Sequence, residues 1–326
     1  MSEKRRSLIY VYINNNHSNP NSYSAEMGLA MMNEVIYLIA NMCFALIMAP
    51  LIDGIERKVK ARVQNRRGPS IFQTWYDLIK MFRKPSGITG RPAMVYKLGP
   101  LLYFSYLLAI ILLIPLLFYS PLSFIGDIIL VIYLLASSRI FLMLGSISST
   151  NPYSIIGSNR EISLSIFEEL AIAEILGIII LSTNSLLINN IFPAVPPVKA
   201  SLILALILLG VVSYIENQRL PFELGEAEPE LSGGSILEYT GKELGLFYYS
   251  HYIRRLIYIS IFLDIFIPHT ILIRIWLYPI CLILVSTFFG IVEALMGRFR
   301  IDQALSFLKK TTLIGGVLLI AAVIGI

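Results

Sequence analysis

Long apolar blocks alternate with polar connections over most of the chain. The blocks are rich in Leu, Ile, Val and Phe and fall at residues 33–52, 98–118, 124–144, 164–182, 200–215, 255–273, 275–296 and 311–326. A helix needs roughly 20 mostly apolar residues to cross the hydrocarbon core of a bilayer. A single block of this kind also suits a buried helix of a soluble protein, but eight of them do not. The pattern therefore predicts an all-α, polytopic membrane protein with about eight transmembrane helices.

The polar segments divide the chain into an extension and one membrane domain. Residues 1–30 are polar and rich in Asn. They lack the long apolar core and the small-residue cleavage site of a signal peptide. We therefore expect residues 1–30 to form a loosely ordered extension and residues 31–326 to form a single membrane domain. Two long connections, at 53–97 and 214–254, interrupt that domain.

The first of these connections contains an amphipathic segment. Pro69 stands where a helix can begin, and Pro85 ends the segment. Apolar side chains recur between them at helical spacing, at Ile71, Phe72, Trp75, Leu78, Ile79 and Phe82. This pattern is typical of a helix that lies in the cytoplasmic membrane interface. A helix packed on the protein's own loops has the same period and stays an alternative.

Composition and charge refine this picture. Of 326 residues, 56% are hydrophobic and 14% are charged, against about 25% charged in soluble domains. The connections after the first, third, fifth and seventh blocks hold 11, 1, 4 and 4 Lys and Arg residues, together 20 of 26, when Arg255 at the first position of the sixth block is counted with the fifth connection. The positive-inside rule places these connections in the cytoplasm and both termini outside. The net charge of +5 therefore needs no nucleic-acid partner to explain it.

Cysteine and histidine offer no redox or metal site. Cys43 and Cys281 are far apart in the sequence, and the three histidines do not cluster. No zinc, iron–sulfur or haem ligand set is recognisable. We therefore expect this chain to bind no metal or cofactor, and any redox centre to sit on a partner.

Carboxyl groups gather in two places and provide the candidate chemistry. Glu161 opens the fourth apolar block, and Glu168, Glu169 and Glu174 lie within it. A charge at mid-bilayer costs about 2.5–3.5 kcal/mol, so an intramembrane carboxyl is a functional candidate by default. Ion pairing with Arg139 or Arg160 is the structural alternative.

The second group of carboxyls lies in the connection 214–254. Apolar residues are interleaved with these acids, which favours a loop folded back between helices, although a solvated acidic loop stays possible. Crowded carboxyls in a low-dielectric site can share and relay protons. The candidate proton or ion path comprises Glu161, Glu168, Glu169, Glu174, Glu216, Glu223, Glu226, Glu228, Glu230, Arg219 and Arg139.

Two motifs carry a resemblance to a known family. Glu56-Arg57-Lys58-Val59, Arg66-Arg67-Gly68-Pro69, Gln73 and Asp77-Leu78-Ile79-Lys80 form the first, and the second is Glu216-Asn217-Gln218-Arg219-Leu220-Pro221-Phe222-Glu223, closed by Glu238-Tyr239-Thr240-Gly241. Their order and spacing resemble the H subunit of bacterial complex I, which corresponds to subunit 1 of mitochondrial NADH dehydrogenase. The chain departs from complex I members in one place, because only three residues separate Pro69 from Gln73. This compact form resembles the membrane subunit of energy-converting, membrane-bound hydrogenases and related ferredoxin-linked complexes.

The resemblance implies a subunit that couples electron transfer to proton or sodium movement in the cell membrane. It implies cytoplasmic partners, namely hydrogenase- or dehydrogenase-like subunits and an iron–sulfur subunit, which would carry iron–sulfur clusters and, in hydrogenases, a nickel–iron centre. Antiporter-like and small membrane subunits and the lipid bilayer complete the expected partners. The residues implied in docking the peripheral arm are Glu56, Arg57, Arg62, Arg66, Arg67, Gly68, Pro69, Gln73, Trp75, Asp77, Lys80, Glu238 and Tyr239.

Several alternatives to a hydrogenase-type subunit stay open. The same subunit of a sulfane-reductase complex and the quinone-site subunit of a complex I-like dehydrogenase have this architecture. A stand-alone transporter is disfavoured because the chain shows no two related halves with paired broken helices. A passive membrane anchor is disfavoured because an anchor has no need of Glu168, Glu169 and Glu174 within a membrane helix.

Overall fold

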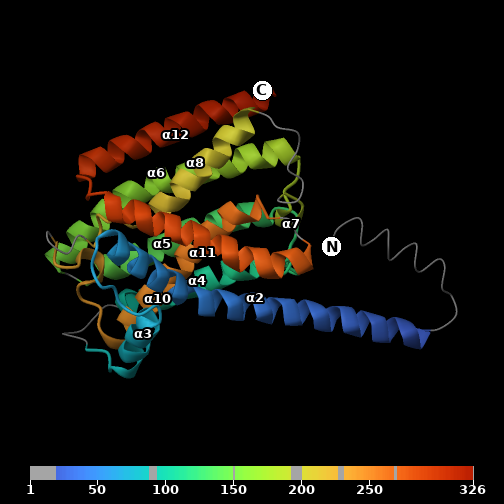
Figure 1. Cartoon of the computed structure of the whole chain (residues 1–326), viewed down its shortest axis with the longest axis horizontal. Helices are drawn as coiled ribbons and strands as arrows, with labels where there is room; N and C mark the ends of the chain where they lie inside the picture. The colour runs from blue at the N-terminus through green and yellow to red at the C-terminus, as the bar shows by residue number, and fades with distance from the viewer. Residues whose placement is uncertain are drawn as a thin grey trace.

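The computed structural model describes residues 20–87, 94–149, 151–191, 200–226, 231–267 and 270–325. Within these ranges the chain forms helices and no strand, which confirms the all-α prediction. Long helices run side by side in one bundle (Figure 1). They are α2 (Pro20–Val63), α4 (Met94–Leu113), α5 (Asp127–Ile147), α6 (Pro152–Thr183), α8 (Ala200–Glu216), α10 (Gly241–Asp264), α11 (Ile271–Leu295) and α12 (Ile301–Ile324). Short helices α3 (Gln73–Arg83), α7 (Ile188–Ile191) and η1 (Gly234–Ile236) lie in the connections.

Each of the eight predicted apolar blocks overlaps a different long helix, although the sixth block, 255–273, runs past the end of α10 at Asp264. Among the described residues, five helices are long and apolar enough to cross a membrane, namely α2 from Met31 onward, α4, α5, α11 and α12. Helix α8 is apolar but has only 17 residues. Helices α6 and α10 carry more charged side chains. The membrane character is therefore supported, and the count of eight crossings stays a prediction.

Several helix boundaries differ from those read from the sequence. Helix α2 begins at Pro20, inside the segment expected to be a loosely ordered extension, and continues to Val63. The first long connection therefore begins at residue 64, eleven residues later than predicted. Arg274, assigned to a connection, lies buried within α11. The bounds of α8 and α10 shorten the acidic connection to residues 217–240.

The packing of α3 corrects the predicted amphipathic face. The helix begins at Gln73 instead of Pro69 and buries Thr74 together with Leu78. Thr74 turns inward because its hydroxyl donates a hydrogen bond to Asp53 on α2 at 2.9 Å. Phe72 and Ile79, two residues of the predicted apolar face, are exposed in this chain. Helix α3 therefore packs on its own protein and still presents apolar side chains outward.

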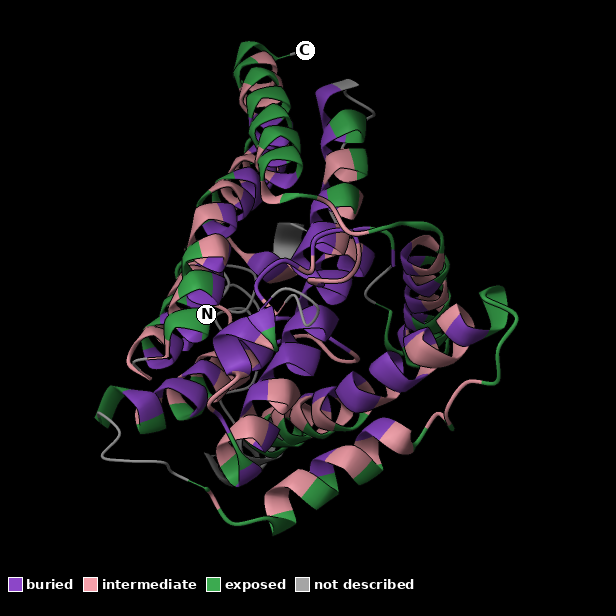
Figure 2. Ribbon diagram, turned by 90° about the vertical axis from the view of Figure 1, so that its left-hand side faces the viewer, coloured by how far each residue is buried: buried purple, intermediate pink, exposed green. Residues whose placement is uncertain are grey.

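Exposed residues are spread over the outer faces of the long helices (Figure 2), and many of them are large and apolar. On α11, for example, Leu272 is 82% exposed and Trp276 is 76% exposed. Outward-facing apolar side chains of this kind suit helices solvated by lipid. Buried charges, by contrast, need partners. Most of them gather close to the helix ends that carry α3 and the acidic connection, and a separate buried pair joins Asp264 at the end of α10 to Arg274 near the start of α11.

The start of α6 fixes the acidic connection in place. Asn151 caps the helix by accepting a hydrogen bond from the amide of Tyr153 at 2.9 Å, and Pro152 occupies the first position, where its lack of an N–H costs nothing. The amide group of Asn151 also donates to Glu238 at the far end of the connection. The connection is therefore tied to the first turn of α6.

Candidate functional site

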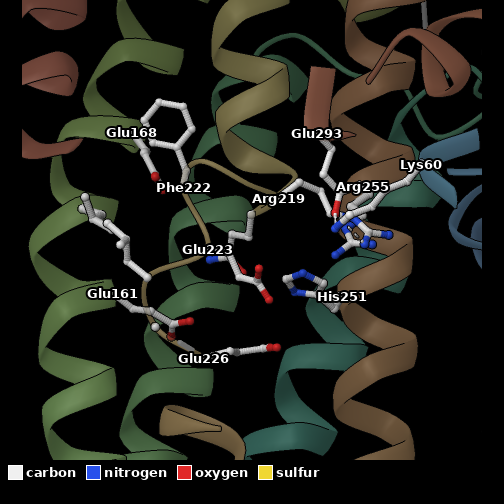
Figure 3. Close-up of a pocket in the computed structure, with 14 residues that line it drawn as sticks. Lys60, Glu161, Glu168, Arg219, Phe222, Glu223, Glu226, His251, Arg255 and Glu293 are labelled. Atoms are coloured by element: carbon white, nitrogen blue, oxygen red, sulfur yellow. Dashed lines mark hydrogen bonds and ion pairs between the residues drawn. The ribbon is translucent and has the colours of Figure 1, made fainter. Parts of the chain in front are cut away.

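A polar cavity of about 120 Å³ lies between α2, α6, α10, α11 and the connection 217–240. That volume holds several water molecules. The charged and titratable residues that line it are Lys60, Glu161, Glu168, Arg219, Glu223, Glu226, His251, Arg255 and Glu293 (Figure 3). The acidic connection is therefore folded back between helices, as one of the two sequence interpretations held.

A buried cluster of charges adjoins the cavity at Glu168. Arg139 forms ion pairs with Glu168 and Glu216 and lies 3.9 Å from Glu169. Arg254 contacts Glu216 at 2.9 Å and Glu169 at 3.4 Å. The structural alternative of pairing with Arg139 therefore holds for Glu168. Pairing does not prevent proton exchange, because neighbouring carboxyls that share cations titrate together.

Asp53 on α2 organises a second buried cluster. It accepts hydrogen bonds from Arg255 at 2.7 Å and from Thr74, and it forms ion pairs with Arg57 at 2.8 Å and with Arg219. These contacts join α2, α3, α10 and the acidic connection at one carboxylate. Asp53 was not among the candidate residues because it stands at the edge of the first apolar block, where a charge is unremarkable.

Arg219 pairs with carboxyls other than those expected from the sequence. Its ion-pair partners are Asp53, Glu56 at 3.2 Å and Glu293 at 3.5 Å. Lys60 holds the same Glu293 at 2.7 Å. Burial lowers the pKa of the Arg219 guanidinium, but its acidic neighbours raise the pKa above the ordinary value on balance, so it stays charged.

Glu161 and Glu226 differ from the other carboxyls of the site. Neither has an ion-pair partner within 4.0 Å among the described residues, although both line the cavity. Their approach depends on glycine. A Cβ at Gly225 would collide with the Glu161 side chain, and a Cβ at Gly157 would lie 2.7 Å from the carbonyl oxygen of Gly225. Small residues therefore allow the acidic connection to press against α6.

A charge count explains why these two carboxyls stand apart. Around the cavity and its two clusters, the described residues include nine carboxyls and seven permanent cations. The carboxyls are Asp53, Glu56, Glu161, Glu168, Glu169, Glu216, Glu223, Glu226 and Glu293, and the cations are Arg57, Lys60, Arg139, Arg219, Arg254, Arg255 and Arg298. Two carboxyls therefore lack a compensating charge. Binding a proton at each is the least costly way to keep them buried.

Burial raises the pKa of Glu226 to about 8, and the nearby charges of Glu161 and Glu223 add to this effect. The native state then holds this proton to a higher pH than the unfolded chain does. Stability must therefore fall as the pH rises from about 5 to about 8 and level off above that range.

We expect Glu226→Gln to remove this pH-dependent loss, because glutamine cannot ionise. Thermal unfolding of the detergent-solubilised protein is measured at pH 5 and at pH 8. The melting temperature of the variant minus that of the parent should be a few degrees larger at pH 8 than at pH 5. Asp302→Asn, at a side chain that is 78% exposed, serves as the control and should follow the parent. Parallel curves for Glu226→Gln and the parent would contradict the assignment.

The remaining candidate path residues differ in where they lie. Glu174 sits on a different face of α6 and contacts Gly315 of α12. Glu223 lines the cavity and pairs with Arg298 at 3.3 Å. Glu228 and Glu230 lie outside the described residues. The structure thus gathers Glu161, Glu168, Glu169, Glu216, Glu223, Glu226, Arg139 and Arg219, and it places Glu174 apart.

The residues implied in docking separate into buried and exposed sets. Glu56 and Tyr239 are buried, Glu56 against Arg219 and Tyr239 stacked on Tyr96, so neither presents a surface to a partner in this chain. The aromatic ring of Trp75 packs near that of Tyr249. The side chain of Gln73 donates to Asp77, which lies 3.8 Å from Arg57. Each of these side chains is engaged within the molecule.

The exposed set forms a basic groove beside α3. It is lined by Lys58, Arg62, Asn65, Arg66, Arg67, Gly68, Pro69 and Ser70. Among the described residues, its four cations have no carboxylate partner at the groove, in contrast to the interior cations. Lys80 is also exposed, on the outer face of α3. This surface suits an acidic partner.

Three residues of the site were missed for an identifiable reason. Arg254 and Arg255 stand at the edge of the sixth apolar block, and they were counted only as flanking charges for orientation. His251 was set aside because it does not cluster with other histidines in the sequence. The signal that was available for all three is their position within about one helical turn of the start of an apolar block, on a helix facing other charged segments. Among the described residues, no group of three or more His, Cys, Asp or Glu side chains is arranged to hold a metal ion.

Comparisons with known proteins agree on one family. The family model described as NADH dehydrogenase matches residues 35–324. Hydrogenase-4 component C of Escherichia coli (strain K12) is 32% identical over 72% of this chain and 76% of the relative. NADH-quinone oxidoreductase subunit 8 of Rhodothermus marinus is 29% identical over 86% of this chain and 86% of the relative.

A solved structure has the same fold. It belongs to the membrane-bound sulfane sulfur reductase, an archaeal respiratory membrane complex, and it matches with a TM-score of 0.80 and 25% sequence identity. The match covers 89% of this chain and 99% of the other. The similarity thus extends over nearly the whole membrane domain.

Proposed function

Because the chain belongs to the NADH dehydrogenase family, we propose that it is the membrane subunit of a respiratory-type oxidoreductase complex that couples electron transfer to ion translocation. The observation that carries this proposal is the buried cavity in which two carboxyls lack a compensating cation. A site of this kind binds and releases protons when a nearby charge changes. A passive anchor has no use for it.

The cavity gives the coupling a physical route. An electron that arrives on a partner at the cytoplasmic face adds negative charge near the acidic connection. That charge raises the proton affinity of Glu226 and then of Glu161, which lie on the same side of the cavity (Figure 3). The paired carboxyls Glu168, Glu169 and Glu216 continue from Glu161 toward the interior of the bundle. Released protons or sodium would then pass to antiporter-like membrane subunits.

A hydrogenase-type complex is the favoured setting. The short spacing between Pro69 and Gln73 and the similarity to a hydrogenase-4 component support it. In this proposal the chain itself binds no cofactor, and iron–sulfur clusters and a nickel–iron centre sit on partner subunits. The similarity to a sulfane sulfur reductase and to a quinone oxidoreductase subunit supports the two alternatives.

Identification of the partners tests this proposal most directly. The tagged protein is purified from membranes in a mild detergent, and the accompanying polypeptides are identified by mass spectrometry. We expect an iron–sulfur subunit and a large subunit with cysteine pairs that can hold nickel. A large subunit without those cysteines would favour a sulfane-reducing or quinone-linked complex, and recovery of the chain with no redox subunit would contradict the proposal.

The basic groove is the proposed docking surface for the peripheral arm. We expect Arg66→Glu combined with Arg67→Glu to loosen the arm, because both side chains are exposed and face an acidic partner in this proposal. Co-purification in moderate salt should fall several-fold while the membrane-inserted amount of the chain stays unchanged. Arg300→Glu, a charge reversal at a side chain that is 83% exposed, is the matched control. Equal recovery of the arm with all variants would contradict docking at this groove.

The proposed orientation places the groove in the cytoplasm and both termini outside. In a background with Cys43 and Cys281 replaced by serine, Gln64→Cys and Lys242→Cys should react with a membrane-impermeant maleimide only in inverted vesicles. Ile125→Cys, on the connection between α4 and α5, should react only in intact cells or right-side-out vesicles. Reversed reactivity would overturn the orientation.

A further inference from the structure

His251 is a titratable side chain of the cavity to which the proton path described so far assigns no role. It lies on α10, is 5% exposed and lines the cavity. Its Nδ1 atom has no hydrogen-bond partner among the described residues. A buried imidazole nitrogen without a partner is uncommon, because most buried polar groups are hydrogen-bonded. His251 therefore lines the cavity with one buried nitrogen that no described protein atom satisfies.

The surroundings of His251 place it between two kinds of charge. Figure 3 shows Glu161 and Glu226 on one side of the cavity, and Arg255, Lys60 and Glu293 on the other, with His251 between them. The groups that face it are Lys60 from α2, Glu161 and Glu168 from α6, Arg219, Glu223 and Glu226 from the acidic connection, Arg255 from α10 and Glu293 from α11. Of the five carboxyls, only Glu161 and Glu226 lack a cation partner among the described residues.

We propose that His251 relays protons between Glu226 and Glu161 through water in the cavity, and that the ion moved through this cavity is therefore a proton. This inference rests on the proposed function. Neutral imidazole accepts a proton on one nitrogen and releases one from the other. The carboxylic acid Glu226 gives a proton to His251, and His251 gives its other ring proton to the carboxylate Glu161. The step leaves a Glu226 carboxylate, a protonated Glu161 and a neutral His251 in the opposite tautomer.

The same lining disfavours a metal cation. Hard cations bind several oxygen ligands at once. Here Glu168 and Glu293 are held by Arg139 and Lys60, and Glu223 is held by Arg298. An imidazole nitrogen prefers transition metals to hard cations. Three permanent cations on the wall, Lys60, Arg219 and Arg255, repel any added positive ion but do not prevent a proton from moving along hydrogen bonds.

Truncation with chemical rescue tests the relay. The complex is studied in inverted vesicles with reduced methyl viologen as electron donor, and proton uptake and viologen oxidation are followed optically. We expect His251→Ala to lower proton uptake about tenfold or more. Added imidazole should restore a large part of it, because the cavity of about 120 Å³ together with the vacated side chain admits the free ring. His251→Asn keeps a polar group of similar width but cannot relay, so it should stay low with and without imidazole.

The outcomes separate the relay from a structural role and from the proposed function. Uptake by His251→Asn within about twofold of the parent would overturn the relay, as would an assembled His251→Ala that imidazole does not rescue. If neither variant assembles, the parent still decides the ion: uptake that requires sodium and collapses with a sodium ionophore overturns the inference. If Glu161→Gln loses proton uptake while His251→Asn keeps normal proton uptake, the relay is refuted and the proposed function stands. If both variants keep normal proton uptake, the proposed coupling is refuted as well.

Discussion

Replacing Arg139 with methionine is expected to prevent the protein from accumulating in a folded form. Arg139 is 2% exposed and forms ion pairs with Glu168 and Glu216. Methionine matches much of its length but leaves two buried carboxylates without their shared cation. Removal of one partner of a buried ion pair costs about 3–5 kcal/mol. That loss is comparable to the total stability of many domains.

The measurement is the fraction of monodisperse protein after detergent extraction, together with its melting temperature. Arg139→Lys keeps the charge but loses the two-pronged geometry of guanidinium, so an intermediate result is expected. Adding Glu168→Gln to Arg139→Met should recover part of the loss, because it removes one stranded charge. Lys97→Met, at an exposed position, controls for loss of positive charge. Normal yield and melting temperature for Arg139→Met would show that the cluster is not buried as described.

Glu161→Gln is expected to reduce proton uptake by more than tenfold while leaving assembly intact. Glu161 lines the cavity and has no ion-pair partner among the described residues, so glutamine keeps its size without stranding a cation. The change removes only the ability to bind and release a proton. If coupling is tight, electron transfer falls together with proton uptake. A tenfold loss corresponds to about 1.4 kcal/mol of barrier.

Glu174→Gln is the matched control for this experiment. Both residues are glutamates of α6, but Glu174 contacts Gly315 of α12 instead of the cavity. Uptake by Glu174→Gln should stay within about twofold of the parent. Equal losses in the two variants would mean that the path is not confined to the cavity. If both variants were fully active, the acidic connection would have a structural role only.

The sequence predicted the bundle well because membrane helices are recognisable from composition. Eight apolar blocks sufficed to place eight long helices, since each block must satisfy its own backbone hydrogen bonds within the helix. The ends were less certain. A charged extension such as Lys58 to Val63 continues α2 without any break in helix propensity, so hydropathy alone places the end too early.

The sequence predicted most of the carboxyls that form the candidate site, but it predicted only some of their contacts. Glu161 and Glu168 are seven residues apart and share a helix face, so periodicity sufficed to bring them together. The partners of Arg219 depended on how the acidic connection folds back, and Asp53 and Glu293 come from helices far away in the sequence. No local pattern encodes such pairings. Thr74, a polar residue of α3, is buried because its hydroxyl donates a hydrogen bond to Asp53.

The glycine contact between α6 and the acidic connection has a mechanical consequence. Gly157 meets the backbone of Gly225 and Ser235 directly, with no flexible side chain between them. Backbone packed against backbone has little compliance, because tightly packed interiors transmit displacement instead of absorbing it. The connection and the first turns of α6 are therefore expected to move together as one rigid unit. In the proposed function, a partner that displaced the connection would therefore also displace Glu161, and the distance between the groups that exchange the proton would change.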